Sequence, residues 1–241
     1  MTSYLIVNGD DFGASRGINR GILEVHREGI LTSASLMVDM PASEEAGRLV
    51  RRTPDLSVGL HVAVTCESGA PRFDWDDADR CGAELARQLE RFEKLTAELP
   101  THLDAHHNVH RDPRLLPHFL ELARRVGLPL REHSPVRYFS EFYGQWDGEP
   151  HPEQISVESL LRMIEAEFTT GSSELSCHPG YVDAEFPTGY SDERELERRT
   201  LCHPSVRARL DALGVRLVGF RDLDAVGFSL AADRRFPWRG S

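Results

Sequence analysis

The stretch YLIVNGDDFG at residues 4–13 decides the fold of this chain. Four apolar or β-branched residues lead into two adjacent carboxylates, Asp10 and Asp11, and then a glycine. A short apolar run bounded by a turn signal is typical of a strand buried on both faces, as in parallel sheets. Ligands of such sheets bind beyond the carboxyl ends of the strands, where both carboxylates stand. The two carboxylates repel each other, which favours a cation beside one of them. The alternative is a polar strand end in which Asp11 caps the next helix.

Strand-like and helix-like stretches alternate along the rest of the chain. Apolar residues have helical spacing at 15–28, 41–52, 82–99, 115–126, 156–168 and 192–213. Strand-like stretches lie at 31–40, 57–65, 101–104, 129–132, 173–177 and 215–220. Alternating βα units predict a parallel sheet that right-handed crossovers can close. We therefore predict one α/β domain over 1–241, an irregular, TIM-like (β/α) barrel of about seven parallel strands with a tail at 228–241. An open doubly wound sheet is the alternative, but no GxGxxG or P-loop follows the first strand.

Composition and charge restrict the partners and the compartment. With 28 Lys and Arg against 39 Asp and Glu, the net charge of −11 argues against nucleic acid or anionic membrane as the main partner. The four cysteines show no CxxC spacing, so we expect reduced thiols and no zinc knuckle. The chain begins directly with the first expected strand and has no run of about 18 apolar residues. We expect a cytoplasmic protein without a membrane span. We also expect a homodimer, because this is the commonest assembly among soluble oligomers.

Charged and imidazole side chains stand at the ends of several expected strands. Besides Asp10 and Asp11, these are His61, His106, Arg131 and His178. Because the carboxyl ends of parallel strands share one edge, all of them could face a single mouth. No single residue carries this inference, and His61 taken alone could equally be a histidine of the core.

The stretch THLDAHHNVH at residues 101–110 holds four histidines and an aspartate, a composition that favours metal binding over a plain polar loop. One carboxylate and two imidazoles suffice for a divalent metal with open positions, and Asp11, His61 and His106 are the predicted ligands. In an extended chain His107 would point away from His106. His110 could line the pocket or support a ligand, and Asp104 could fix the tautomer of a ligand imidazole.

The blocks LIVNGDDFGASRGINRGI, TSASLMV, SVGLHVAVT, THLDAHHNVH, EFYG and SCHPGYVD resemble the YdjC/ChbG family of carbohydrate deacetylases. They occur in the family's order and together span most of the chain. The resemblance implies a NodB-like irregular barrel and divalent-metal-dependent removal of N-acetyl groups from amino sugars, with chitooligosaccharides as typical substrates. The acetyl group would leave as acetate after attack by a metal-activated water.

Position by position, Asp11, His61 and His106 match the family's metal ligands. Asp10 matches its catalytic base, and His178 matches the late histidine that acts as acid; Arg131 is a plausible partner that orients Asp10. We expect zinc or magnesium as the metal, and such a ligand set would also accept manganese, cobalt or nickel. Two departures stand out. Asn108 replaces a third histidine found in many members, and the segment 62–101 is shorter than in the chitooligosaccharide enzymes, which argues against a long oligomer.

The segment 134–155 is rich in aromatic residues and lacks clear periodicity. We predict that it lies near the site and binds the sugar, because long irregular loops in compact domains are usually functional. Flat rings that can pack on a pyranose are supplied by Tyr138, Phe142, Tyr143 and Trp146. Phe142 could equally be a core residue that anchors the loop.

Three other functions would use a similar set of residues. A metal-dependent phosphoesterase usually needs two metals and more Lys or Arg at the mouth, where only Arg131 is obviously placed. A non-haem Fe(II) oxygenase also uses two histidines and a carboxylate, but its ligands lie close together on an antiparallel barrel. A non-catalytic sugar-binding relative would have no need of Asp10 beside Asp11.

Overall fold

The sheet of this protein is seven-stranded and parallel, and its strands converge on one edge. The computed structural model describes residues 3–168, 170–183, 186 and 188–227. Every strand pair in the sheet is parallel, which confirms the predicted (β/α) class with seven strands. Across the sheet the order is β4 (Leu103–Ala105), β3 (Ser57–Val62), β2 (Ser33–Leu36), β1 (Ser3–Phe12), β8 (Ser172–Cys177) and β5 (Arg137–Phe139), with β9 (Val215–Leu217) also on β1.

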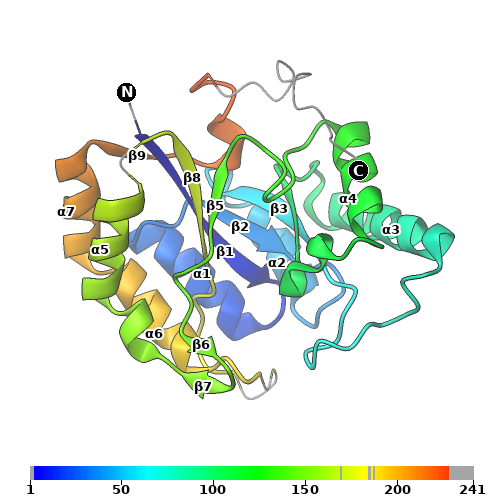
Figure 1. The fold of residues 1–241 in the computed structure, drawn as a ribbon, viewed down its shortest axis with the longest axis horizontal. Helices are drawn as coiled ribbons and strands as arrows, with labels where there is room; N and C mark the ends of the chain where they lie inside the picture. The colour runs from blue at the N-terminus through cyan, green and yellow to red at the C-terminus, as the bar shows by residue number, and fades with distance from the viewer. Residues whose placement is uncertain (1–2, 169, 184–185, 187, 228–241) are drawn as a thin grey trace.

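The strand β1 runs through the middle of the curled sheet, dark blue in Figure 1. It is ten residues long, and all of them except Tyr4 are buried. Strand β8 pairs along one of its edges, while β9 pairs with its start and β2 with its end on the other. The end strands β4 and β5 are not paired with each other in the described part of the chain, so the barrel is open there.

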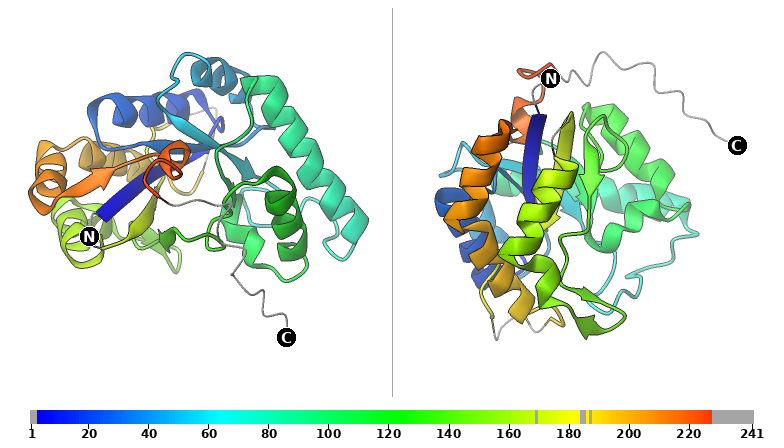
Figure 2. Two further views of the ribbon diagram at one scale, coloured as in Figure 1. Left: turned by 90° about the horizontal axis from the view of Figure 1, so that it is seen from above. Right: turned by 60° about the vertical axis from the view of Figure 1, so that its left-hand side comes forward.

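The described residues form seven α-helices, which cover the outside of the curled sheet (Figures 1 and 2). Helix α1 packs against α6, α2 against α3, α3 against α4, and α5 against α7. Among the described residues, none of these helices has the length and apolar character needed to cross a membrane. Their bounds are α1 (Arg16–Glu28), α2 (Ser43–Val50), α3 (Ala78–Thr96), α4 (Leu116–Val126), α5 (Val157–Glu167), α6 (Asp192–Leu201) and α7 (Pro204–Leu213).

Several elements differ from those expected from the sequence. The stretch 192–213 is two helices because Pro204 has no backbone N–H to continue the first one. Helix α3 begins four residues early, where the side chain of Asp77 accepts a hydrogen bond from the backbone N–H of Arg80. The strand expected at 31–40 is only β2, and that at 129–132 shrinks to one bridge between Leu130 and Leu103.

The aperiodic segment 134–155 contains short elements of its own. They are β5, the hairpin of β6 (Gln145–Trp146) and β7 (Glu149–Pro150), and the 3₁₀ helix η2 (Pro152–Ile155). Further 3₁₀ turns are η1 (His106–Arg111) and η3 (Phe220–Asp222). The tail predicted at 228–241 lies outside the described residues, and the extent of the domain over 1–241 stays a prediction.

The segment that follows β8 is fixed between α1 and α6. A Cβ on Gly21 of α1 would lie 2.5 Å from the Cα of Gly180, so only glycine permits this approach. The backbone N–H of Gly180 donates to the carbonyl of Arg194 at 3.1 Å, and that of Tyr181 to Gly17 at 3.2 Å. These contacts set the position of His178 at the edge of the sheet.

Candidate active site

A cavity of about 440 Å³ lies at the carboxyl-end edge of the sheet. Its wall includes Asp10 and Asp11 from β1, His61 from β3, His106 from η1 and His178 from the end of β8. The predicted strand-end residues therefore meet in one place. Arg131, which completes that set, lies directly behind Asp10 and is itself buried.

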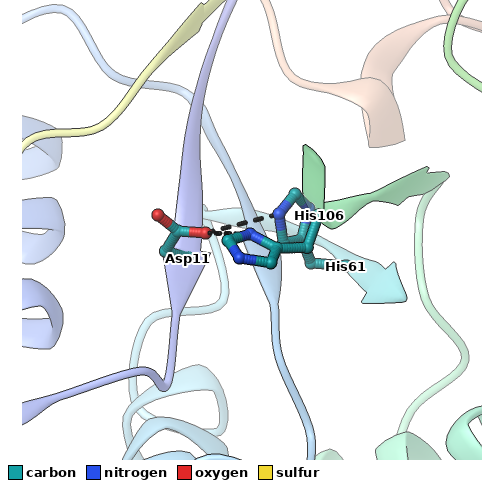
Figure 3. Close-up of side chains that lie close together, drawn as sticks. All are labelled: Asp11, His61 and His106. Atoms are coloured by element: carbon teal, nitrogen blue, oxygen red, sulfur yellow. Dashed lines mark ion pairs between the residues drawn. The ribbon is translucent and has the colours of Figure 1, made fainter. Parts of the chain in front are cut away.

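Asp11, His61 and His106 point toward one another across the wall of this cavity (Figure 3). Asp11 Oδ1 lies 3.1 Å from His106 Nδ1 and 3.4 Å from His61 Nε2. One ligand atom from each residue lies within 4.8 Å of the other two, and all three side chains are buried. The spacing is therefore compatible with a single ion bound by all three.

The donor chemistry of these residues fits a divalent metal. Asp11 Oδ1 is buried but has no hydrogen-bond partner of good geometry in the described structure, a costly state for a polar atom, whereas the far nitrogen of His106, Nε2, lies 3.5 Å from Glu67 Oε1. One carboxylate oxygen and two imidazole nitrogens suit several divalent first-row ions and magnesium less strongly. Asp11 also has a φ of 67°, an uncommon conformation for a residue with a side chain and one that clusters at functional sites.

Asp104 fixes the ring of His61. The Nδ1–H of His61 donates to Asp104 Oδ1 at 2.8 Å, which turns Nε2 toward Asp11. Burial alone would lower the pKa of His61, but Asp104 and Asp11 raise it to about 10. The imidazole is thus held firmly between two carboxylates, in the orientation that a ligand needs.

Arg131 is surrounded by three buried carboxylates. Its Nη1 and Nη2 each lie 2.8 Å from an oxygen of Asp10, and its Nε lies 2.9 Å from Glu174. Nη2 also lies 2.9 Å from Asp104 Oδ2. Burial alone would raise the pKa of Asp10, but the charge and hydrogen bonds of Arg131 outweigh this effect and hold the pKa below its ordinary value. In a second potential ligand group, Asp10, His61 and Asp104, both carboxylates are therefore already paired with the guanidinium.

His178 lies between Asp10 and Glu197. Its Nε2 is 3.9 Å from Asp10 Oδ2, and its Nδ1 is 3.9 Å from Glu197 Oε1. Glu197 also accepts a hydrogen bond from the backbone N–H of His178 and one from the hydroxyl of Tyr190, which in turn accepts from the N–H of Gly144. Burial lowers the pKa of His178 to about 4 despite the nearby carboxylates, so the ring is neutral at pH 7.

Comparison with known proteins assigns this arrangement to a family. The family described as "YdjC-like protein" matches residues 4–212. The chain belongs to the YdjC-like family.

Two curated bacterial relatives match nearly the whole chain. A protein of Geobacillus stearothermophilus named carbohydrate deacetylase is 35% identical, over 92% of this chain and 98% of its own. A protein of Klebsiella pneumoniae named chitooligosaccharide deacetylase is 34% identical, over 92% of this chain and 100% of its own. Among solved structures, an Enterococcus faecalis protein described as a candidate cellobiose-phosphate cleavage protein superposes with a TM-score of 0.80 at 26% identity, over 92% of this chain and 99% of that one.

Among the charged residues of this YdjC-like chain that were missed from the sequence, two come from the same helix. Arg194 lines the cavity and its Nη2 lies 2.6 Å from Asp11 Oδ2, while Glu197 supports His178. Both belong to α6, whose buried face also carries Glu193 and Thr200. Charged side chains at the positions where a helix should present apolar residues to the core were the signal that could have revealed them.

The aromatic segment contributes less to the cavity than predicted. Tyr138 and Tyr143 line it, and Tyr143 stacks on Tyr190 with ring centroids 4.6 Å apart. Phe142 does not, because its ring is buried in the main core, only 1% exposed. Trp146 stacks on His151 of the hairpin and is absent from the cavity wall.

Two expectations for the histidine-rich stretch are also wrong. His110 does not line the cavity: it is fully buried and bonded through Nε2 to Glu132 at 3.0 Å. His107 does not point away from His106, since their rings lie 3.8 Å apart and both line the cavity. The chain is not extended here, because His107 and Asn108 have φ values of 56° and 51°.

Proposed function

We propose that this YdjC-like protein is a metal-dependent carbohydrate N-deacetylase that releases acetate from an N-acetylated amino sugar. The observation that carries the proposal is one cavity wall with two kinds of group. Asp11, His61 and His106 are spaced to hold one cation, and a separate pair, Asp10 and His178, is placed beside them to move protons. The names of the Geobacillus and Klebsiella relatives support the same reaction.

The cation would be held by Asp11, His61 and His106. Zinc and magnesium are the first candidates from the sequence, and the two imidazole nitrogens favour zinc of these two; manganese, cobalt or nickel are further candidates. When bound, it supplies a Lewis acid for the acetyl carbonyl and lowers the pKa of the attacking water. Asp104 keeps His61 in the orientation required for this role.

Asp10 is the proposed base. Arg131 holds both of its oxygens and keeps it ionised, and Asn8 donates a further hydrogen bond at 2.8 Å. As the water oxygen bonds to the acetyl carbon, Asp10 accepts the proton that the water loses. His178 Nε2 lies 3.9 Å from Asp10 Oδ2, which is longer than a hydrogen bond, so this proton reaches the imidazole, neutral in the resting protein, only when the two groups move closer.

His178 is the proposed acid. When the bond between the acetyl carbon and the sugar nitrogen breaks, the imidazolium gives its proton to the departing amine, leaving a free amino sugar and acetic acid, which ionises to acetate in water. The proton that leaves the water is thus the one that the amine receives, and the ring returns to its neutral form. General base and general acid steps contribute about 10²–10⁴-fold each.

The cavity favours a small acetylated sugar. Its volume of about 440 Å³ lies in the lower part of the range for small-molecule sites, and Tyr138 and Tyr143 offer ring faces to a pyranose. We propose an N-acetylglucosamine-type group of a short saccharide or glycoconjugate. The cytoplasmic location and the homodimer are part of this proposal and rest on the sequence alone.

Phosphoester cleavage is supported less well, although the Enterococcus relative is described in terms of a sugar phosphate. A phosphate needs free cationic side chains, whereas the arginines among the described lining residues, Arg111 and Arg194, are paired with Glu132 and Asp11. Arg131 also pairs with both carboxylates of the ligand group where a second metal would bind. A pure sugar binder would leave the Asp10–Arg131 pair without a purpose.

The test is acetate release from a panel of N-acetylated mono- and oligosaccharides, with each divalent metal added back to stripped protein. We expect acetate and free amine in equal amounts, only with metal present. Asp11→Ala should lose both bound metal and turnover. Phosphate release from sugar phosphates, or sugar binding without acetate release by the metal-loaded protein, would contradict the proposal.

A further inference from the structure

Arg194 brings a second arginine, besides Arg111, to the described wall of the cavity, from α6. Its guanidinium is buried, 4% exposed, and Nη2 lies 2.6 Å from Asp11 Oδ2. Nη1 donates to the carbonyl of His178 at 3.4 Å, and the group lies 5.8 Å from the ring centroid of Tyr190. An arginine beside a predicted metal ligand is unexpected, because its charge opposes binding of any cation.

We propose that Arg194 is a positioning residue that restricts Asp11 to one ligand oxygen and thereby sets which cations the site prefers. The two oxygens of Asp11 have different surroundings. Oδ2 accepts from Arg194, whereas Oδ1 faces His106 Nδ1 and His61 Nε2 and has no hydrogen-bond partner of good geometry. This inference rests on the proposed function, since it concerns the cation of that site.

A carboxylate can bind a metal with one oxygen or with both. Calcium takes about 6–8 oxygen ligands and accepts both oxygens readily, whereas zinc and magnesium use smaller shells. For Asp11 to bind through both oxygens, it would have to give up a charge-assisted hydrogen bond in a buried site. The hydrogen bond from Arg194 therefore adds a penalty for large oxygen-seeking ions that small ions, which need one oxygen, do not meet.

The charge of Arg194 and its hydrogen bond to Asp11 Oδ2 have separable effects on metal binding. The positive charge of Arg194 repels every divalent ion to a similar extent, so it lowers affinity without changing the order of preference. Occupation of Asp11 Oδ2 changes that order, because it acts only on ions that need both oxygens. Selectivity between two divalent ions therefore reports on position alone.

The experiment compares cobalt(II) and calcium binding to the full chain by calorimetry, with the visible spectrum of bound cobalt as a second readout. In Arg194→Met, which keeps an unbranched apolar stem, we expect the preference for cobalt over calcium to fall by about tenfold or more, as a second oxygen becomes available. The visible spectrum of bound cobalt should stay as in the wild type, because this small ion does not need the second oxygen of Asp11. Arg194→Lys keeps the charge with a simpler donor and should shift the preference in the same direction by less.

Arg198→Met is the matched control. Arg198 lies one turn further along α6, is also largely buried, and pairs with Glu24 rather than with a group of the cavity. Its replacement should leave the preference unchanged.

Equal changes in cobalt and calcium affinity, or an unchanged preference in Arg194→Met, would overturn the positioning role. If Arg194→Met does not fold, an unchanged preference in Arg194→Lys has the same meaning. A wild-type protein that binds neither ion nor zinc would overturn the proposed function itself.

Discussion

Replacing Asp10 with asparagine separates metal binding from catalysis. Asp10 accepts three hydrogen bonds of 2.8 Å, two from Arg131 and one from Asn8, and it touches none of the three proposed metal ligands in an ion pair. Asparagine has nearly the same shape, so the cation site should keep its geometry. An amide has no proton affinity in this pH range, however, and cannot take the proton of the attacking water.

The sizes of the two effects follow from these contacts. Loss of a general base lowers the rate by about 10²–10⁴-fold, which corresponds to about 3–5 kcal/mol in the barrier. The amide nitrogen cannot accept from Arg131, so at least one hydrogen bond to a charged group is lost, at about 1.5–3 kcal/mol of stability. For a chain of this size the melting temperature should fall by about 3–12 °C.

The assay measures acetate release, bound metal and thermal unfolding on the same preparation of Asp10→Asn. The control is Asp112→Asn, since Asp112 makes a similar paired contact with Arg114 at the surface, where it contributes little. We expect full metal content, a small loss of stability and a large loss of turnover in Asp10→Asn alone. Turnover within about threefold of wild type would refute the role of Asp10 as base.

Dialysis against a chelator should abolish acetate release, and added zinc or another divalent ion should restore it; activity that survives in metal-free protein would contradict the assigned site. Phe142→Ala should lower stability by about 3–5 kcal/mol without raising KM, since its ring belongs to the core. By contrast, Tyr143→Ala should raise KM about 2–10-fold, because the sugar loses its contact with the ring. Trp146→Ala should change neither the stability nor KM. Thermal unfolding and initial rates distinguish these outcomes. The pKa of His178 is lowered to about 4, so its ring has no proton to lose between about pH 6 and pH 8. We therefore expect kcat/KM not to decline as the pH rises over that range. A decline of kcat/KM with rising pH that disappears in His178→Asn would instead show that the resting ring is protonated, against this expectation.

The strand ends made most of the site predictable. Asp10, Asp11 and His61 lie near the carboxyl ends of buried strands and His106 directly follows one, and the parallel sheet brings them to one edge whatever the details of the loops. Arg131 was found by the same reasoning although its own strand is reduced to a single bridge at Leu130. Strand polarity is a property of the whole sheet, so errors of a few residues in its limits do not move these side chains.

The direction of side chains outside the strands was not predictable in the same way. In the aperiodic segment 134–155, residue type alone did not separate Phe142 in the core from Tyr143 on the cavity wall. The left-handed backbone at His107 has no signal in a sequence without glycine there. Arg194 and Glu197 meet partners about 180 and 20 residues away, contacts that only the packing of α6 creates.

The hydrogen bonds from Gly144 through Tyr190 and Glu197 to His178 have a practical consequence for engineering. The wall of the cavity and His178, the proposed proton donor, share one chain of contacts, so a loop transplanted from a relative to broaden substrate range would also disturb the imidazole. A successful graft would carry Tyr190 and Glu197 along with the loop. Exchange of the 140s region alone should impair turnover even when the new sugar fits.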